Sequence, residues 1–290
     1  MFRTTASPIL AVIIAVVAGS LPLKAQPTIT PCSSAFNSAG MVVNKHYPHD
    51  AFFGSFAVVK HVSSVKPGSG PCDFGPLDPD IALGPGVSVS RGVALDRFGN
   101  LFVAAGNGTA TSILKIAPPY DGTPTVFFSG ARDLISLAIR GHLLYAADFG
   151  AGTILRFDMN DVPASATTFA TVPGVFGIFV AGRDDLFVTS NAGGEGSDDV
   201  KRVTRNGVST IATGLGFPEG IAGDDENLYV ASGAVVVTVP RSGGTPVFYA
   251  GSPILFSHAM FVFEGGGYVT DSNGPAGHVF KFTLIDDDDN

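Results

Sequence analysis

Three chemically capable side chains stand beside the starts of apolar runs in this sequence. They are Arg91 before GVALDRFG, Glu219 in Pro-Glu-Gly, and His258 at the start of HAMFVFEGG. An arginine and a glutamate so placed could form an ion pair or bind an anionic or hydroxylated ligand. A histidine there could accept a proton near neutral pH. The alternative is a closed polar network that binds nothing.

Two aspartates, Asp148 and Asp271, share another repeated position, at the end of an aromatic run. The other residues at this position are Ala105, Ser190 and Ser232. Small polar residues at the end of a strand commonly accept N–H groups of the following turn. We therefore interpret this column as turn-capping, with a ligand-binding role as the alternative.

Two further segments carry metal-ligand residue types. His46, His49 and Asp50 form HYPHD, and residues 193–199 read GGEGSDD. Neither specifies a complete ligand set, so a surface-loop interpretation is favoured for both, with loose Ca²⁺ binding as the alternative for the second. The sequence contains no G-x-S-x-G and no phosphate-binding glycine loop.

These residues lie within a sequence repeat. Its central aromatic residues recur 43, 42, 42 and 39 residues apart, at Phe102, Tyr145, Phe187, Tyr229 and Tyr268. Each unit contains an apolar run, the aromatic run and a third run, and the first four units add a fourth. Short alternating runs separated by Gly- or Pro-rich turns predict β-hairpins. Four strands in about 42 residues predict an all-β propeller of four-stranded blades.

The first strand of each unit is expected to be innermost, where small residues allow strands to crowd around the axis. Gly92, Ser136, Gly177 and Gly220 occupy equivalent positions, and His258 is the exception. The column just before them then reads Arg91, Ile135, Phe176, Glu219 and Ser257.

The number of blades depends on residues 26–90. We expect six blades, with residues 41–60 building most of one, and five as the alternative. We expect SFAVVKHV (55–62) to close the ring as an N-terminal strand, and the Pro- and Gly-rich residues 63–90 to form a long surface loop. Residues 91–285 carry the repeated blades and form one domain with 41–90.

The runs GVALDRFGNLFVAA (92–105), FPEGIAGDDENLYVAS (217–232) and YVTDSNGPAGHVFKF (268–282) resemble the NHL and SMP-30/gluconolactonase group of β-propellers. The resemblance implies this fold and, for lactonase members, a divalent cation held by Glu, Asn and Asp before the inner strands. Only Glu219 matches that pattern, and Phe176 stands where the Asn is expected. Glu219 is thus the candidate ligand for Ca²⁺ or another divalent cation, with no cofactor as the alternative.

The chain has 290 residues and a formal net charge of −8, without a cluster of Lys and Arg, which argues against nucleic acid as a partner. Arg3, the apolar run 9–21 and Leu23-Lys24-Ala25 predict a secretory signal peptide over residues 1–25, with an uncleaved anchor as the alternative. We therefore expect a secreted or periplasmic protein without a membrane span in its mature chain. The run 286–290 is expected to be a solvated acidic tail.

Two cysteines, Cys32 and Cys72, most simply form one disulfide in an exported protein, with two thiols as the alternative. The leading functional hypothesis is an exported, monomeric, non-catalytic propeller that binds a small molecule, a glycan or a protein on one face. The alternatives are a metal-dependent hydrolase of the lactonase type and a lyase acting on cyclic esters.

Overall fold

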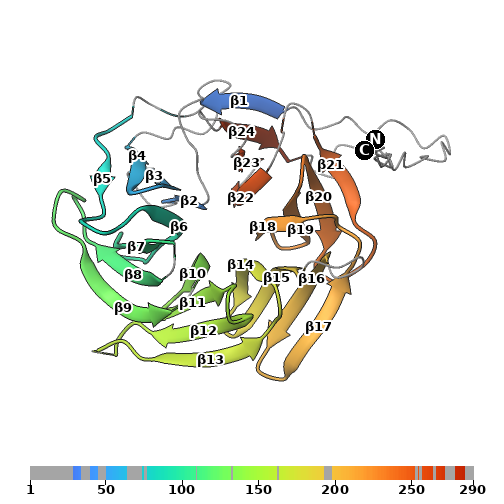
Figure 1. The fold of residues 1–290 in the computed structure, drawn as a ribbon. Coiled ribbons are helices and arrows are strands. Elements are labelled where there is room, and N and C mark those ends of the chain that lie inside the picture. Colours follow the sequence, from blue (N-terminus) through green and yellow to red (C-terminus); the bar gives the residue numbers. More distant parts are fainter. Residues whose placement is uncertain are drawn as a thin grey trace, which may run out of the picture.

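The repeated runs form antiparallel strands arranged as blades around one axis (Figure 1). The computed structural model describes residues 29–33, 40–44, 50–63, 74, 77–108, 110–131, 133–161, 163–192, 198–251, 254, 257–263, 266–271 and 278–284. The predicted signal segment, His46, His49, Cys72 and the acidic tail lie outside these ranges. Within these ranges every regular element is a strand. The described residues therefore contain no helix that is long and apolar enough to cross a membrane.

Six four-stranded sheets make up the ring, numbered here as blades 1 to 6 in chain order. Blade 1 contains β2 (Gly40–Val43), β3 (Ala51–Ser55), β4 (Val58–Val62) and β5 (Ile81–Ala82). Blade 2 contains β6 (Val89–Leu95), β7 (Leu101–Gly106), β8 (Thr111–Ile116) and β9 (Thr125–Ala131). Blade 3 contains β10 (Leu134–Arg140), β11 (Leu143–Asp148), β12 (Thr153–Asp158) and β13 (Ala166–Thr171).

Blade 4 contains β14 (Val175–Gly182), β15 (Asp185–Asn191), β16 (Asp198–Thr204) and β17 (Gly207–Ala212). Blade 5 contains β18 (Pro218–Gly223), β19 (Asn227–Ser232), β20 (Val235–Pro240) and β21 (Val247–Ala250). Blade 6 contains β22 (Ser257–Phe263), β23 (Gly266–Asp271), β24 (His278–Thr283) and β1 (Ile29–Ser33). Each inner strand contacts the inner strands of both neighbouring blades, and β2 contacts β22, so the ring is closed. The six-bladed prediction is confirmed.

The ring is closed by an N-terminal strand, as predicted, but by a different one. β1 pairs antiparallel with β24 as the outermost strand of blade 6 (Figure 1). The predicted closing run, 55–62, instead contributes the end of β3 and all of β4 in blade 1. The sequence hid β1 because its five residues include Pro31, which a strand tolerates only at an edge or bulge.

The predicted surface loop over residues 63–90 is wrong at three places. Ile81 and Ala82 form β5, the outer strand of blade 1, and β6 already begins at Val89. Phe74 packs edge-on against Phe53 and stacks on Tyr268, with ring centroids 5.7 and 5.0 Å apart. These contacts cover the junction between blades 1 and 6.

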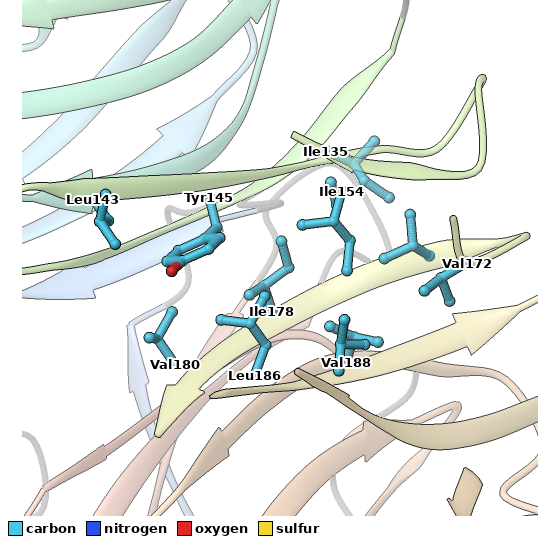
Figure 2. Packing of buried hydrophobic residues seen from close by; sticks show 12 residues of the cluster. Ile135, Leu143, Tyr145, Ile154, Val172, Ile178, Val180, Leu186 and Val188 are labelled. Atoms are coloured by element: carbon cyan, nitrogen blue, oxygen red, sulfur yellow. The ribbon is translucent and has the colours of Figure 1, made fainter. Parts of the chain in front are cut away.

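The core consists of apolar layers between neighbouring blades. Figure 2 shows the layer between blades 3 and 4, where Tyr145, Ile154, Ile178 and Leu186 meet. The aromatic residue of each repeat is buried there: Phe102, Tyr145, Phe187, Tyr229 and Tyr268. The repeat spacing therefore reflects one buried aromatic side chain per blade interface.

Small residues at the starts of the inner strands let neighbouring strands approach closely. A Cβ atom on Gly92 would lie 2.6 Å from the Leu137 nitrogen, and one on Gly220 would overlap the His258 carbonyl oxygen. Gly40, which the sequence reading did not place, has the same role in blade 1, against the Arg91 carbonyl oxygen. Crowding at the axis is thus confirmed as the reason for this column.

The strand register corrects the alignment of blade 6 by one residue. Tyr229 pairs with Ala222, and Tyr268 pairs with Phe261. Counting back from these partners places Ala259, not His258, in the small-residue column. His258 belongs to the column of Glu219, in place of Ser257. The register is irregular between Ser257 and Met260, and this unit lacks a glycine that would mark the column.

Candidate functional site

The column before the small residues lies at the face of the ring where the inner strands begin, called here the entry face. With the corrected register it reads Arg91, Ile135, Phe176, Glu219 and His258, from blades 2 to 6. The order of the blades brings Glu219 and His258 together, because β18 and β22 are neighbours. Blade 2, which carries Arg91, lies across the ring from blade 5.

Glu219 and His258 form a mostly buried polar pair on this face. His258 Nδ1 contacts Glu219 Oε2, and the side chains are 20% and 5% exposed, respectively. This contact is an ion pair when the imidazole is protonated. A carboxylate next to a ring nitrogen fixes the orientation of the imidazole.

Buried threonines fix the backbone on both sides of this pair. Thr189 Oγ1 donates to the Glu219 carbonyl oxygen over 2.5 Å and accepts from Gly177 N over 2.7 Å. Thr270 Oγ1 accepts from Ala259 N over 2.9 Å, directly after His258. The two inner strands are therefore held by the second strands of blades 4 and 6, which limits movement of the pair.

Arg91 does not reach Glu219, so the suggested arginine–glutamate ion pair is wrong. Arg91 Nη1 instead contacts Asp133 Oδ1, in the loop before β10, and both side chains are about one-third exposed. Asp133 was not predicted from the sequence, although its place just before an inner strand was a usable signal. Glu219–His258 and Arg91–Asp133 are thus two separate polar pairs on opposite sides of the axis.

Apolar side chains separate the two polar pairs. Ile135 is buried, and Phe176 packs edge-on against Phe149 at a centroid distance of 6.0 Å. Together with His258 and the small residues they line a space of about 90 Å³ at the start of the channel. That volume holds about three water molecules, so an organic ligand does not fit inside this end of the channel.

Three phenylalanines project from turns on the entry face. Phe149 follows β11, Phe56 follows β3, and Phe217 precedes β18. Phe56 and Phe217 are 61% and 51% exposed and have φ angles of 49° and 74°. A non-glycine residue in this left-handed region carries a strain of about 1–2 kcal/mol. The turns hold large apolar side chains in solvent despite that strain.

The turn-capping interpretation of Asp148 is confirmed, since its Oδ1 accepts from Ala151 N over 3.2 Å. Ser190 and Ser232 act differently from the prediction. Their hydroxyl groups donate to the carbonyl oxygens of Pro173 and Gly216 in the loops before the inner strands, over 2.7 and 3.1 Å.

The other predicted metal candidates do not form a ligand cluster with Glu219 in the described part of the chain. Asp50 is buried on the opposite face of the ring, called here the exit face, with its Oδ1 3.6 Å from His61 Nε2. Of the run 193–199, Asp198 and Asp199 lie in the described part. Asp199 Oδ2 pairs with Lys201 Nζ over 2.5 Å, and Asp198 Oδ2 accepts from Phe217 N over 3.3 Å.

The described residues do not fit a divalent-cation centre at Glu219. Among them no group of three or more His, Cys, Asp or Glu side chains converges on one point. Glu219 has an imidazole beside it, while Ile135 and Phe176 offer no oxygen. A hard cation such as Ca²⁺ takes about six to eight oxygen ligands.

Solved structures with this architecture have diverse functions. The PQQ-bound aldose sugar dehydrogenase from Streptomyces coelicolor aligns over 90% of this chain and 99% of its own, with a TM-score of 0.67 and 14% identity. A gluconolactonase from Xanthomonas campestris aligns over 91% and 99%, with a TM-score of 0.57 and 13% identity. A chain of the nidogen/laminin complex aligns over 76% and 84%, with a TM-score of 0.63 and 15% identity.

No protein-family model and no curated protein sequence matches the chain. The resemblance to gluconolactonase-like and NHL-type propellers is confirmed as a likeness of fold. These neighbours include two enzymes and a component of a protein complex, so the fold does not indicate the function. The function has to be inferred from the entry-face residues.

Proposed function

We propose that this protein binds a small hydroxylated molecule, such as a saccharide, on the entry face and does not transform it. The observation that carries the proposal is the pairing of buried Glu219 with His258 beside the apolar surface of Phe176 and Phe149. Binding sites combine apolar and aromatic walls with a few well-placed polar groups. A carboxylate accepts hydrogen bonds from hydroxyl groups, and an imidazole can both donate to and accept from them.

The ring offers a second polar contact across the axis. Arg91 and Asp133 are partly exposed and carry donors and acceptors of opposite charge. A saccharide that spans the channel would contact Glu219 and His258 at one end and Arg91 at the other. The apolar floor of Ile135 and Phe176 lies between them.

A glycan array probed with the labelled mature protein tests this proposal. We expect selective binding of a few saccharides, weakened at least about tenfold in Glu219→Gln, since a hydrogen bond to a charged group contributes about 1.5–3 kcal/mol. Arg202→Gln, on the third strand of blade 4, is the matched control and should bind normally. Absence of saccharide binding, or equal binding by Glu219→Gln, would refute the proposal. Capture of a protein ligand instead would count against it in the same way.

A metal-dependent lactonase is the second candidate. The observation in its favour is the carboxylate-oriented imidazole of His258, an arrangement suited to a general base. Metal analysis of the purified protein, followed by a panel of lactones, separates the two candidates. Stoichiometric metal that is lost in Glu219→Ala, together with lactone hydrolysis, would support the enzyme and overturn the binding proposal. The proposed lyase activity on cyclic esters would be measured in parallel.

We also propose that the protein acts outside the cytoplasm as a monomer. The positively charged start, short apolar run and small residue at Ala25 support export. N-terminal sequencing of protein recovered from the extracellular or periplasmic fraction should begin at Gln26. An intact Met1 in a cytoplasmic fraction would contradict export.

A further inference from the structure

A large cavity lies away from the entry face. It has a volume of about 630 Å³ and opens between blades 2 and 3 on the exit face. Its walls come from the β6–β7 turn, β8, β9, the β10–β11 turn and the segment after β12. A cavity of this size matches sites that hold small organic ligands.

The neighbouring interface, between blades 3 and 4, is closed at the equivalent place by a polar cluster around Asp184. Asp184 Oδ1 accepts from the Tyr145 hydroxyl over 2.7 Å and from Arg156 Nη1 over 3.1 Å. Its Oδ2 accepts from Arg205 Nε over 2.5 Å. One carboxylate therefore neutralises the cation on the third strand of the preceding blade.

Strand register shows which residues take these places between blades 2 and 3. Lys115 pairs with Phe102 as Arg156 pairs with Tyr145. In blades 3 and 4 the residues two before the aromatic are Leu143 and Asp185, which pair with Asp158 and Thr204. The residues just before the first partners, His142 and Asp184, therefore correspond, and so do those just after the second partners, Met159 and Arg205. The equivalents of Tyr145, Arg156, Asp184 and Arg205 are Phe102, Lys115, His142 and Met159.

The cation is thus kept while its carboxylate partner is lost. Among the residues that the structure describes, no carboxylate lies within ion-pair distance of Lys115 Nζ, which sits 5.7 Å from the centroid of the Phe102 ring. His142 occupies the place of Asp184 and lies 3.6 Å from Asp158 through Nε2 and Oδ2. Met159 replaces the second cation with an apolar side chain. The space that the Asp184 cluster fills between blades 3 and 4 is therefore part of the open cavity between blades 2 and 3.

The other charged residues that line the cavity have other surroundings and do not form an ion pair with Lys115. Arg97 lies over the Phe98 ring, 4.6 Å from its centroid. Asp96 accepts three hydrogen bonds within its own turn, from Phe98 N, Asn100 N and Asn100 Nδ2, at 2.9, 2.9 and 2.7 Å. Asp161 is exposed at the edge of the cavity.

We propose that this cavity binds a small organic carboxylate whose charged group takes the place that Asp184 occupies in the next interface. Lys115 pairs with the carboxylate, and Phe127, Met159 and Ala164 contact its apolar body. The aromatic floor of Phe102 and Phe127, with centroids 5.2 Å apart, favours an aromatic body. This site is independent of the proposed saccharide site on the entry face.

Calorimetric titration with 2-naphthoate, and with uncharged 2-naphthamide as the matched probe, tests the proposal on the full mature protein. We expect 2-naphthoate to bind and 2-naphthamide to bind at least about tenfold more weakly, as for loss of a charge-assisted contact. Lys115→Gln should weaken 2-naphthoate to the same degree. His142→Asp should abolish binding, because its own carboxylate would then pair with Lys115. Arg202→Gln, a cation already paired with Asp185, should leave binding unchanged.

Three results would overturn the proposal. The first is no binding of 2-naphthoate up to about 10 mM, a concentration that reveals millimolar affinity. The second is equal affinity for the acid and the amide. The third is undiminished binding by folded Lys115→Gln, with folding verified by its unfolding midpoint.

Discussion

The Asp184 cluster offers the sharpest stability prediction, because one 3% exposed carboxylate receives hydrogen bonds from Tyr145, Arg156 and Arg205. Asp184→Asn keeps the size of the side chain and tolerates the left-handed backbone, whose φ is 55°. It removes the charge. Arg205 is 61% exposed, so its ion pair contributes little. The magnitude therefore depends on the charge-assisted bonds from Tyr145 and the half-buried Arg156, which the substitution weakens. We expect a loss of about 2 kcal/mol in the free energy of unfolding.

The loss should depend on pH. Burial alone would raise the pKa of Asp184, but the hydrogen bonds from Tyr145, Arg205 and Arg156 outweigh burial and lower the pKa below its ordinary value of 3.8. A lowered folded-state pKa gives stability that is present above the unfolded pKa and lost as the pH falls through the folded one. The difference between wild type and Asp184→Asn should therefore be full at neutral pH and shrink below about pH 3.8.

Urea unfolding at several pH values measures this prediction. A loss of about 2 kcal/mol with a slope near 3 kcal/mol per molar urea moves the midpoint by about 0.7 M. Asp185→Asn is the matched control, since Asp185 pairs with the 47% exposed Arg202 and should cost less than about 1 kcal/mol. Equal midpoints for wild type and Asp184→Asn at neutral pH would refute the reasoning. So would a difference that stays constant down to about pH 3.

Three further predictions concern strain, packing and the cysteines. Phe217→Gly should raise the free energy of unfolding by about 0.5–1 kcal/mol in a urea titration, because it relieves a φ of 74°; a loss above about 1 kcal/mol would contradict this. Gly220→Ala should cost at least about 2 kcal/mol in the same assay, because its Cβ would lie 2.8 Å from the Ala259 Cα, while Gly122→Ala, with open space around it, should be near neutral. Cys72 lies outside the described residues, so the disulfide with Cys32 stays a prediction: mass spectrometry after alkylation without reductant should show no label on either cysteine, and two labels would contradict it.

The fold was largely predictable because one aromatic residue per blade must be buried at each interface. That requirement spaces Phe102 and Tyr145 regularly and makes the repeat visible. Blade 1 was harder to see, since Phe52 is followed by turns of a different length and β5 has two residues. β1 was invisible because an edge strand needs neither alternation nor a strong β-former.

The candidate site was only partly predictable. Glu219 and His258 could be named from their position at strand starts, but their contact depends on a one-residue register that no glycine marks in blade 6. The partnership of Arg91 with Asp133 joins two blades and leaves no local pattern. The same limit applies to the Lys115 cavity, which appears only when two blade interfaces are compared.

The most direct test of the central claim is equilibrium binding of the saccharide selected on the array, followed by mass spectrometry of the recovered saccharide. The proposal predicts saturable binding to wild type, affinity at least about tenfold weaker for Glu219→Gln, and a saccharide recovered with its mass unchanged. Equal affinity for the variant, or a recovered product that has gained or lost a chemical group, would contradict it.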